Sequence, residues 1–170
     1  EIGGIDMRKN PAAAKRIIGF VPDRPFLYEK LTGREFLKFI ADLYGVEHKV
    51  FSVRAGRLLS QFGLDEWRDE IIEAYSHGMK QRLIIAAALL HEPKVLVIDE
   101  PMVGLDPAAV KMVKDIFRTL AAQNVTIFVS THTLSIAEDL CDRIGVIHRG
   151  NLLAEGTMSE LNQAAHTGRA

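Results

Sequence analysis

Two adjacent carboxylates follow an apolar run near the middle of the chain. Val95-Leu96-Val97-Ile98 has the composition of a strand buried in a parallel sheet, and Asp99 and Glu100 come directly after it. Open α/β folds bind their ligands at the carboxyl ends of such strands. Phosphoryl transfer from ATP needs a carboxylate for Mg²⁺, and hydrolysis needs a base for the attacking water. We interpret Asp99 as a Mg²⁺ ligand acting through water and Glu100 as the catalytic base; two solvated acids at a strand end are the alternative.

A histidine follows the next apolar run. Val125 to Val129 reads as another buried strand, and Ser130-Thr131-His132 comes after it. Neighbouring parallel strands end at the same sheet edge, so we expect His132 beside the two carboxylates. A histidine there can contact a terminal phosphate and respond to its presence. Taken alone, His132 is better explained as a satisfied structural histidine, and Asp99 and Glu100 on the adjacent strand edge reverse that preference.

A third chemical element opens a helix at Tyr75-Ser76-His77-Gly78-Met79-Lys80. A helix N-terminus exposes unpaired N–H groups at the positive end of the helix dipole, where a phosphate can bind. Ser76 offers a hydroxyl, and Gly78 permits close approach of the backbone. Lys80 opposes the dipole unless an anion docks there. A serine-capped core helix is the alternative interpretation.

The elements that must position these residues alternate along the chain. Strands are predicted at 17–21, 95–98, 125–129 and 144–147, with helices at 76–90, from Pro107 to about Gln123, and at 134–140. This alternation predicts a parallel sheet with right-handed crossovers. Gly150-Asn151 predicts a tight turn after the last of these strands.

The residues ahead of this alternation predict helices only. Thr32 and Glu35 have the spacing of a capping box, Gly45 ends the helix they start, and a second helix fits 50–62. Phe36, Ile40, Leu43 and Tyr44 recur on one face of the first helix. We therefore divide the chain into an α/β core at 1–31 and 92–170 and a helical subdomain at 32–91.

Composition bounds the remaining possibilities. A chain of 170 residues, 48% hydrophobic, can bury one substantial core. The 21 basic and 22 acidic side chains nearly cancel, so no nucleic-acid partner is expected. A single cysteine excludes an internal disulfide, and the longest apolar runs fall short of the roughly 20 residues of a membrane span. Residues 1–6 read as the end of a strand and a turn, so we expect the chain to begin inside a domain.

At these residues the chain resembles the nucleotide-binding domain of ABC transporters, and the resemblance covers essentially all 170 residues. Ser76 to Gln81 is similar to the family's signature motif, and Val95 to Glu100 to its Walker B strand and catalytic glutamate. Gly104-Leu105-Asp106 resembles the D-loop and His132 the switch histidine. The resemblance implies a P-loop NTPase-like parallel sheet, present in part, with an all-helical signature subdomain.

The chain departs from the family pattern in three places. The signature reads Tyr75-Ser76-His77-Gly78-Met79 where Leu-Ser-Gly-Gly-Gln is usual, and Asp23 stands where the loop after the first strand commonly carries a glutamine. Both features are similar to the subgroup that serves ABC-2-type exporters. No Gly-x-x-x-x-Gly-Lys-Ser/Thr phosphate loop (Walker A) occurs, and in the family it lies upstream. We therefore expect ATP hydrolysis by the full-length protein and little activity from residues 1–170 alone.

The resemblance implies a working arrangement. Two nucleotide-binding domains, identical or different, would meet head to tail around ATP and Mg²⁺. Ser76, Gly78 and Met79 would then contact ATP in trans, with Asp106 in the D-loop and Asp23 near the metal. The helical insert and the loop 23–28 would receive a transmembrane permease subunit, which would hold the domain at the cytoplasmic side of the cell membrane. The implied function is ATP hydrolysis that powers transport.

Three rival functions have different sequence signatures. The ATPase half of a chromosome-maintenance protein needs a long coiled coil before the signature, and residues 32–75 show no sustained heptads. A regulatory module that has lost turnover conflicts with the intact Asp99, Glu100 and His132. A soluble translation-associated ABC ATPase would carry two sets of motifs, and one set is present.

Overall fold

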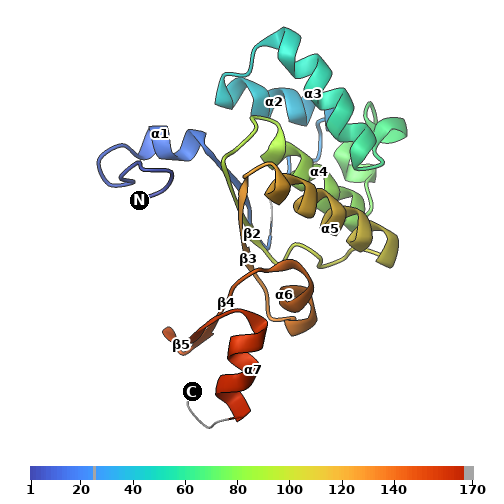
Figure 1. Cartoon of the computed structure of the whole chain (residues 1–170). Coiled ribbons are helices and arrows are strands. Elements are labelled where there is room, and N and C mark those ends of the chain that lie inside the picture. Colours follow the sequence, from blue (N-terminus) through green and yellow to red (C-terminus); the bar gives the residue numbers. More distant parts are fainter. Residues whose placement is uncertain (25, 167–170) are drawn as a thin grey trace. The chain divides into compact units, whose positions relative to one another are not determined.

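A three-stranded parallel sheet organises the first part of the chain (Figure 1). In this computed structural model, which describes residues 1–24 and 26–166, β1 (Ile18–Val21), β2 (Val95–Asp99) and β3 (Thr126–Ser130) lie in the order β1–β2–β3. Val21 pairs with Ile98, and Asp99 pairs with Ser130. The predicted parallel core is confirmed for these three strands. The chain divides into two compact units, 1–130 and 131–170, which we describe separately.

One face of this sheet packs on α4 (His77–Leu89) and α5 (Pro107–Ala122). Leu96 and Ile98 of β2 are fully buried on that face. The opposite face carries Phe20 and Phe128, which are 59% and 63% exposed. The prediction that the strand at 125–129 is buried on both sides is therefore wrong for this chain, because α4 and α5 cover only one side of the sheet.

Gly19 in β1 allows α4 to approach the sheet closely. A Cβ atom at this position would lie 2.6 Å from the carbonyl oxygen of Ala88 in α4. Any larger residue would push the helix away from the strand. This contact sets how closely the C-terminal end of α4 approaches β1.

The segment before α4 is helical, as predicted. It contains α2 (Gly33–Tyr44), α3 (His48–Gln61) and two short 3₁₀ turns, η1 (Asp65–Trp67) and η2 (Ile72–Ala74), while α1 (Pro11–Arg16) precedes β1. The capping box of α2 is confirmed, and Gly45 ends the helix in the left-handed conformation. Leu43 was expected on the buried face but is 66% exposed, because α2 packs through Phe36, Leu37 and Ala41.

The second unit contains α6 (Leu134–Leu140), β4 (Ile144–His148), β5 (Asn151–Gly156) and α7 (Met158–His166). The strand predicted at 144–147 does not join the parallel sheet: β4 pairs antiparallel with β5. Arg149 and Gly150 both have positive φ, which is the backbone that a two-residue hairpin turn requires. The turn was predicted one residue later, at Gly150-Asn151, and the antiparallel pairing it causes was not predicted. Residues 167–170 of the predicted core lie outside the described residues.

Across the described parts of the chain, none of the helices combines the length and apolar character needed to cross a membrane.

Candidate functional site

The acidic pair lies at the carboxyl edge of the parallel sheet. Asp99 is the last residue of β2 and is half-buried, and the N–H of Glu100 donates to the carbonyl of Ser130 at the end of β3 (2.9 Å). Glu100 has φ +49, a left-handed conformation that is uncommon for a residue with a side chain. Such backbones persist where the surrounding structure enforces them, often at functional sites. The chain therefore turns sharply at the glutamate proposed as the base.

Asp23 belongs to the same edge. It follows β1 by two residues, and the last residue of β1 pairs with Ile98, one residue before Asp99. Its carboxylate is exposed and lies 3.8 Å from Nε of Arg24. Pro25, the next residue of this loop, lies outside the described residues. The structure thus brings Asp23 to the edge that bears the acidic pair.

The signature turn begins α4 and is capped by its serine. Ser76 Oγ accepts a hydrogen bond from the N–H of Met79 (3.3 Å), while the N–H groups of His77 and Gly78 lie in the first turn, where a helix lacks internal acceptors. No acidic side chain occupies this first turn. Met79, expected to contact ATP in trans, is buried, and its N–H already serves Ser76. The amides of His77 and Gly78 are therefore the better anion donors.

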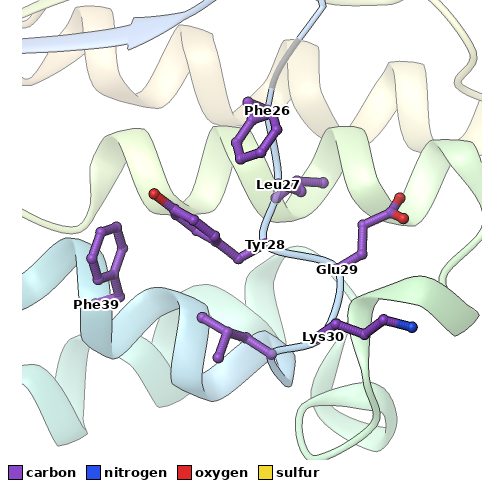
Figure 2. Close-up of a pocket in the computed structure, with 7 residues that line it drawn as sticks. Phe26, Leu27, Tyr28, Glu29, Lys30 and Phe39 are labelled. Carbon is purple, nitrogen blue, oxygen red and sulfur yellow. The ribbon is translucent and has the colours of Figure 1, made fainter.

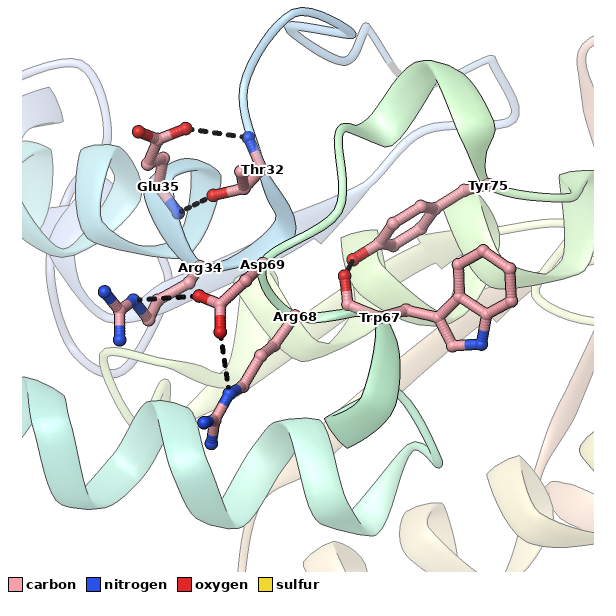
Figure 3. A network of polar contacts seen from close by, with 7 residues as sticks. All are labelled: Thr32, Arg34, Glu35, Trp67, Arg68, Asp69 and Tyr75. Atoms are coloured by element: carbon pink, nitrogen blue, oxygen red, sulfur yellow. Dashed lines mark hydrogen bonds and ion pairs between the residues drawn. The ribbon is translucent and has the colours of Figure 1, made fainter.

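The side chain of Tyr75 connects the signature turn to the helical segment before α4 (Figure 3). Its hydroxyl donates to the carbonyl of Trp67 (2.6 Å), and a Cβ at Gly33, the first residue of α2, would lie 2.3 Å from that hydroxyl oxygen. Burial, followed by the negative charges of Glu70 and Asp69, raises the pKa of Tyr75 to about 12. The phenol therefore stays neutral and hydrogen-bonded at physiological pH.

Lys80 has a protein partner rather than needing a bound anion. Its Nζ lies 2.5 Å from Oε1 of Glu29, and the neighbouring pair Lys30–Glu73 is 2.6 Å apart. The expectation that Lys80 signals an anion at the helix start is therefore corrected, because Glu29 supplies the negative charge. Backbone hydrogen bonds from Glu73 N–H to Glu29 and from Ile72 N–H to Leu31 join the same two segments.

The segment that pairs with the signature helix also lines an apolar groove of about 630 Å³ (Figure 2). Tyr28 makes edge-to-face contacts with Phe26 (5.5 Å between ring centres) and with Phe39 of α2 (5.1 Å). Phe26 is 79% exposed. The groove lies where the loop 23–28 meets the helical insert, the two segments expected to receive a partner. The contact of Tyr28 with Phe39 was not predicted, because it depends on how α2 packs.

The loop after β2 contacts the signature turn. A Cβ at Gly104 would lie 1.9 Å from Cδ2 of His77, and a Cβ at Gly78 would lie 3.1 Å from the carbonyl oxygen of Gly104. Asp106, the D-loop candidate, caps α5: its Oδ1 accepts from the N–H of Ala109 (2.8 Å). The predicted cap and the Pro107 helix start are confirmed. The carboxylate of Asp106 is thus used within its own helix.

The acidic edge fits a magnesium ion that arrives with a nucleotide. No group of three or more His, Cys, Asp or Glu side chains that could hold a metal occurs within residues 1–24 and 26–166. Mg²⁺ is commonly held by one or two carboxylates together with substrate phosphates and waters, rather than by a protein cage. A single half-buried carboxylate at Asp99 is consistent with that mode.

His132 is the second residue of the 131–170 unit and follows the end of β3 by two residues. The end of β3 is paired with Asp99. The joint site of His132 with the acidic pair stays a prediction.

The comparisons with known proteins bear on these features together. A family profile described as "ABC transporter" matches residues 1–103, more than half of the chain and including both carboxylates. The linearmycin resistance ATP-binding protein LnrL of Bacillus subtilis (strain 168) is 39% identical over 160 residues, covering 94% of this chain and 51% of that protein. The bacitracin transport ATP-binding protein BcrA of Bacillus licheniformis is 42% identical over 156 residues, covering 91% and 50%.

A solved structure agrees with the sequence comparisons. It is described as "Structure of ATP binding subunit of ABC transporter", has a TM-score of 0.89 and 33% identity, and is matched over 99% of this chain and 70% of its own. A parallel sheet that ends in two acids, preceded by a helical segment and a serine-capped helix, is thus the frame of an ABC ATP-binding domain. The chain belongs to the ABC transporter family. It spans about half the length of the curated relatives LnrL and BcrA.

Proposed function

We propose that the chain is the part of an ABC transporter's ATP-binding subunit that carries the hydrolytic carboxylates, and that the whole protein hydrolyses ATP to power transport. The observation that carries this proposal lies at the edge of the parallel sheet. There Asp99 ends β2 beside the end of β3, and Glu100 follows it with a left-handed backbone conformation. Family membership and relatives named as transport or resistance ATP-binding proteins support it.

Each residue of the edge has a proposed role. Glu100 accepts the proton of the attacking water, and Asp23 and Asp99 orient the water and the metal's hydration shell. His132 contacts the terminal phosphate. The Mg²⁺ ion would neutralise charge on the phosphates as the transferred group leaves. The expectation that residues 1–170 alone hydrolyse little ATP, because they hold no Walker A motif, stays a prediction.

The signature turn is proposed to act on the nucleotide of a second ATP-binding domain. Ser76 keeps a hydroxyl proton for donation while its oxygen caps α4, and the amides of His77 and Gly78 face the same helix end. ATP would then lie between two domains, and loss of its terminal phosphate would weaken their association. The second domain can be a copy of the same protein or a related one.

The apolar groove at Phe26, Tyr28 and Phe39 is the proposed docking site of a transmembrane permease subunit, which would hold the domain at the cytoplasmic side of the membrane. Exposed aromatic rings in a groove are typical of protein interfaces. The rival DNA-maintenance function needs a long coiled coil before the signature. Here α2 and α3 have 12 and 14 residues and are separated by a left-handed glycine.

Replacing Glu100 by Gln in the full-length protein tests the proposal. The amide keeps the shape of the side chain but cannot accept a proton, so ATP turnover should fall at least about 100-fold, within the range that general-base catalysis contributes. ATP-dependent dimerisation, followed by light scattering, should persist. Glu92→Gln is the matched control, because Glu92 also has positive φ (+54) but precedes β2, at the opposite end of the strand. Near-normal turnover in Glu100→Gln would remove Glu100 from its role.

A further inference from the structure

His77 occupies the space that a side chain at Gly104 would need. A Cβ built on Gly104 would lie 1.9 Å from Cδ2 and 2.5 Å from Nε2 of the imidazole, closer than real side chains approach one another. Gly104 has φ +75, so the backbone there also favours glycine. The ring therefore lies directly against the backbone of the loop that follows the acidic pair.

A second contact joins the same two segments. Gly78 faces the carbonyl oxygen of Gly104 and the side chain of Leu105, which a Cβ at Gly78 would approach to 3.1 Å and 3.7 Å. The first turn of α4 is thus packed on residues 104–105 within one chain. Those residues lead directly into Asp106, the cap of α5. The starts of the two helices are held together through this contact.

We propose that His77 is a positioning residue that holds the signature turn and the 104–106 loop as one body. This inference rests on the proposed function, in which the signature turn contacts a nucleotide in trans. The loop contacts that turn and follows β2, which ends at Asp99 with Glu100 directly after it. The imidazole sets the distance between two segments. One is the start of α4, which is proposed to bind phosphate, and the other is the loop that follows Asp99 and Glu100.

His77 departs from the family's usual signature, and its contact with Gly104 gives this departure a structural role. Where the family's signature usually has a first glycine, this chain has His77, and a glycine there would leave Gly104 without the ring that covers it. The ring atom nearest to the Cβ position at Gly104 is the carbon Cδ2, ahead of Nε2, so we expect the shape of the ring to matter more than its nitrogen atoms. His77→Phe should therefore retain function that His77→Gly loses.

A double-mutant cycle in the full-length protein tests the contact. Gly104→Ala places a methyl group against the ring and should lower ATP turnover at least about tenfold, because misplacing catalytic parts by about 1 Å can cost as much as 100-fold. His77→Gly should lower turnover severalfold. The double variant should regain turnover toward the His77→Gly level, because the methyl group then has room. His77→Phe keeps a flat ring and the same backbone amide, so it should retain severalfold more turnover than His77→Gly.

Gly45→Ala controls for backbone strain. Gly45 has nearly the same φ (+70), but a Cβ there would meet nothing within 4 Å. It should lower the melting temperature through backbone strain alone, by less than Gly104→Ala does, and leave turnover unchanged. Amide hydrogen exchange at the start of α4, measured without nucleotide, should rise in His77→Gly and stay normal in His77→Phe.

The outcomes separate this inference from the function on which it rests. A double variant as inactive as Gly104→Ala alone would overturn the role of His77, because strain rather than the ring would explain the loss. Altered hydrogen exchange with normal turnover in His77→Gly would also overturn it, while a loss of turnover in Glu100→Gln would still support the proposed function. If the unmodified protein shows no ATP turnover, the proposed function fails and this inference fails with it.

Discussion

The starts of α2 and α4 are built alike in the backbone and differ in how their N–H groups are satisfied. Thr32 and Ser76 are both hydroxyl caps with nearly the same extended conformation (ψ 161 and 162). In α2, Glu35 completes the cap by accepting from the N–H of Thr32 (2.9 Å). In α4 the equivalent position holds Met79, and the first turn contains no acidic side chain.

This difference separates a structural helix start from one that can bind a ligand. A carboxylate in the first turn satisfies orphan amides and neutralises the positive end of the dipole. The start of α2 is therefore complete by itself, whereas the start of α4 still offers amides to an external anion. The two starts are also neighbours, because the hydroxyl of Tyr75 lies against Gly33 at the start of α2.

The largest expected effect comes from giving α4 the carboxylate it lacks. Ser76→Asp in the full-length protein keeps a good cap, so the melting temperature should stay the same or rise slightly. The added charge competes for the same amides and repels phosphate. Two like charges about 4 Å apart repel by roughly 4 kcal/mol at the effective dielectric of a protein surface. ATP turnover, measured as phosphate release, should therefore fall by about 100-fold or more.

Thr32→Asp is the matched control for this change. It adds the same charge to a hydroxyl cap of the same geometry, at a helix start where no anion is expected. Turnover should stay within about twofold, with a small loss of stability from repulsion between Asp and Glu35. Equal losses of turnover in both variants would erase the distinction between the two helix starts.

Much of this distinction could be predicted from the sequence, because caps are local. The spacing of Thr32 and Glu35, the start at Ser76 and the cap at Asp106 each depend on residues within one turn, and all three are confirmed. The acidic pair was placed correctly at a strand end because a continuous apolar run indicates a parallel strand.

The features that the sequence did not predict depend on distant neighbours. Lys80 pairs with Glu29, which is 51 residues away, so its partner could not be found from helix patterns. Contact between His77 and Gly104 joins the start of α4 to a loop that only the fold brings near it. The pairing of β4 was missed for another reason: alternation of strands and helices does not reveal whether a strand turns back on the next one.

A smaller effect is expected where the two helix starts meet. Tyr75→Phe removes the hydrogen bond to Trp67 and leaves a partly buried carbonyl with one partner fewer, which should cost about 1 kcal/mol of unfolding free energy. Tyrosinate absorbance should lose the titration step near pH 12, since burial raises the pKa of Tyr75 to about 12. Tyr28→Phe, at an exposed position, controls for loss of a phenol. Persistence of the high step in Tyr75→Phe would show that another tyrosine causes it.

The smallest effect is a pH dependence confined to the start of α2. Hydrogen bonds from the backbone and side chain of Thr32 lower the pKa of Glu35 in the folded protein. A carboxyl group with a depressed folded pKa stabilises the fold above its unfolded pKa, about 4.3, and that contribution disappears as the pH falls through the folded pKa. Glu35→Gln keeps the shape of the capping box without the charge, so its stability should change less between pH 5 and pH 3, approximate limits set by the ordinary pKa of glutamate. Urea denaturation at several pH values measures the difference.

Met79→Gln, the equivalent position in α4, should leave the pH dependence unchanged, because no carboxylate caps that helix. Identical pH profiles for Glu35→Gln and the unmodified protein would mean that the two helix starts do not differ in charge in the way the capping box implies.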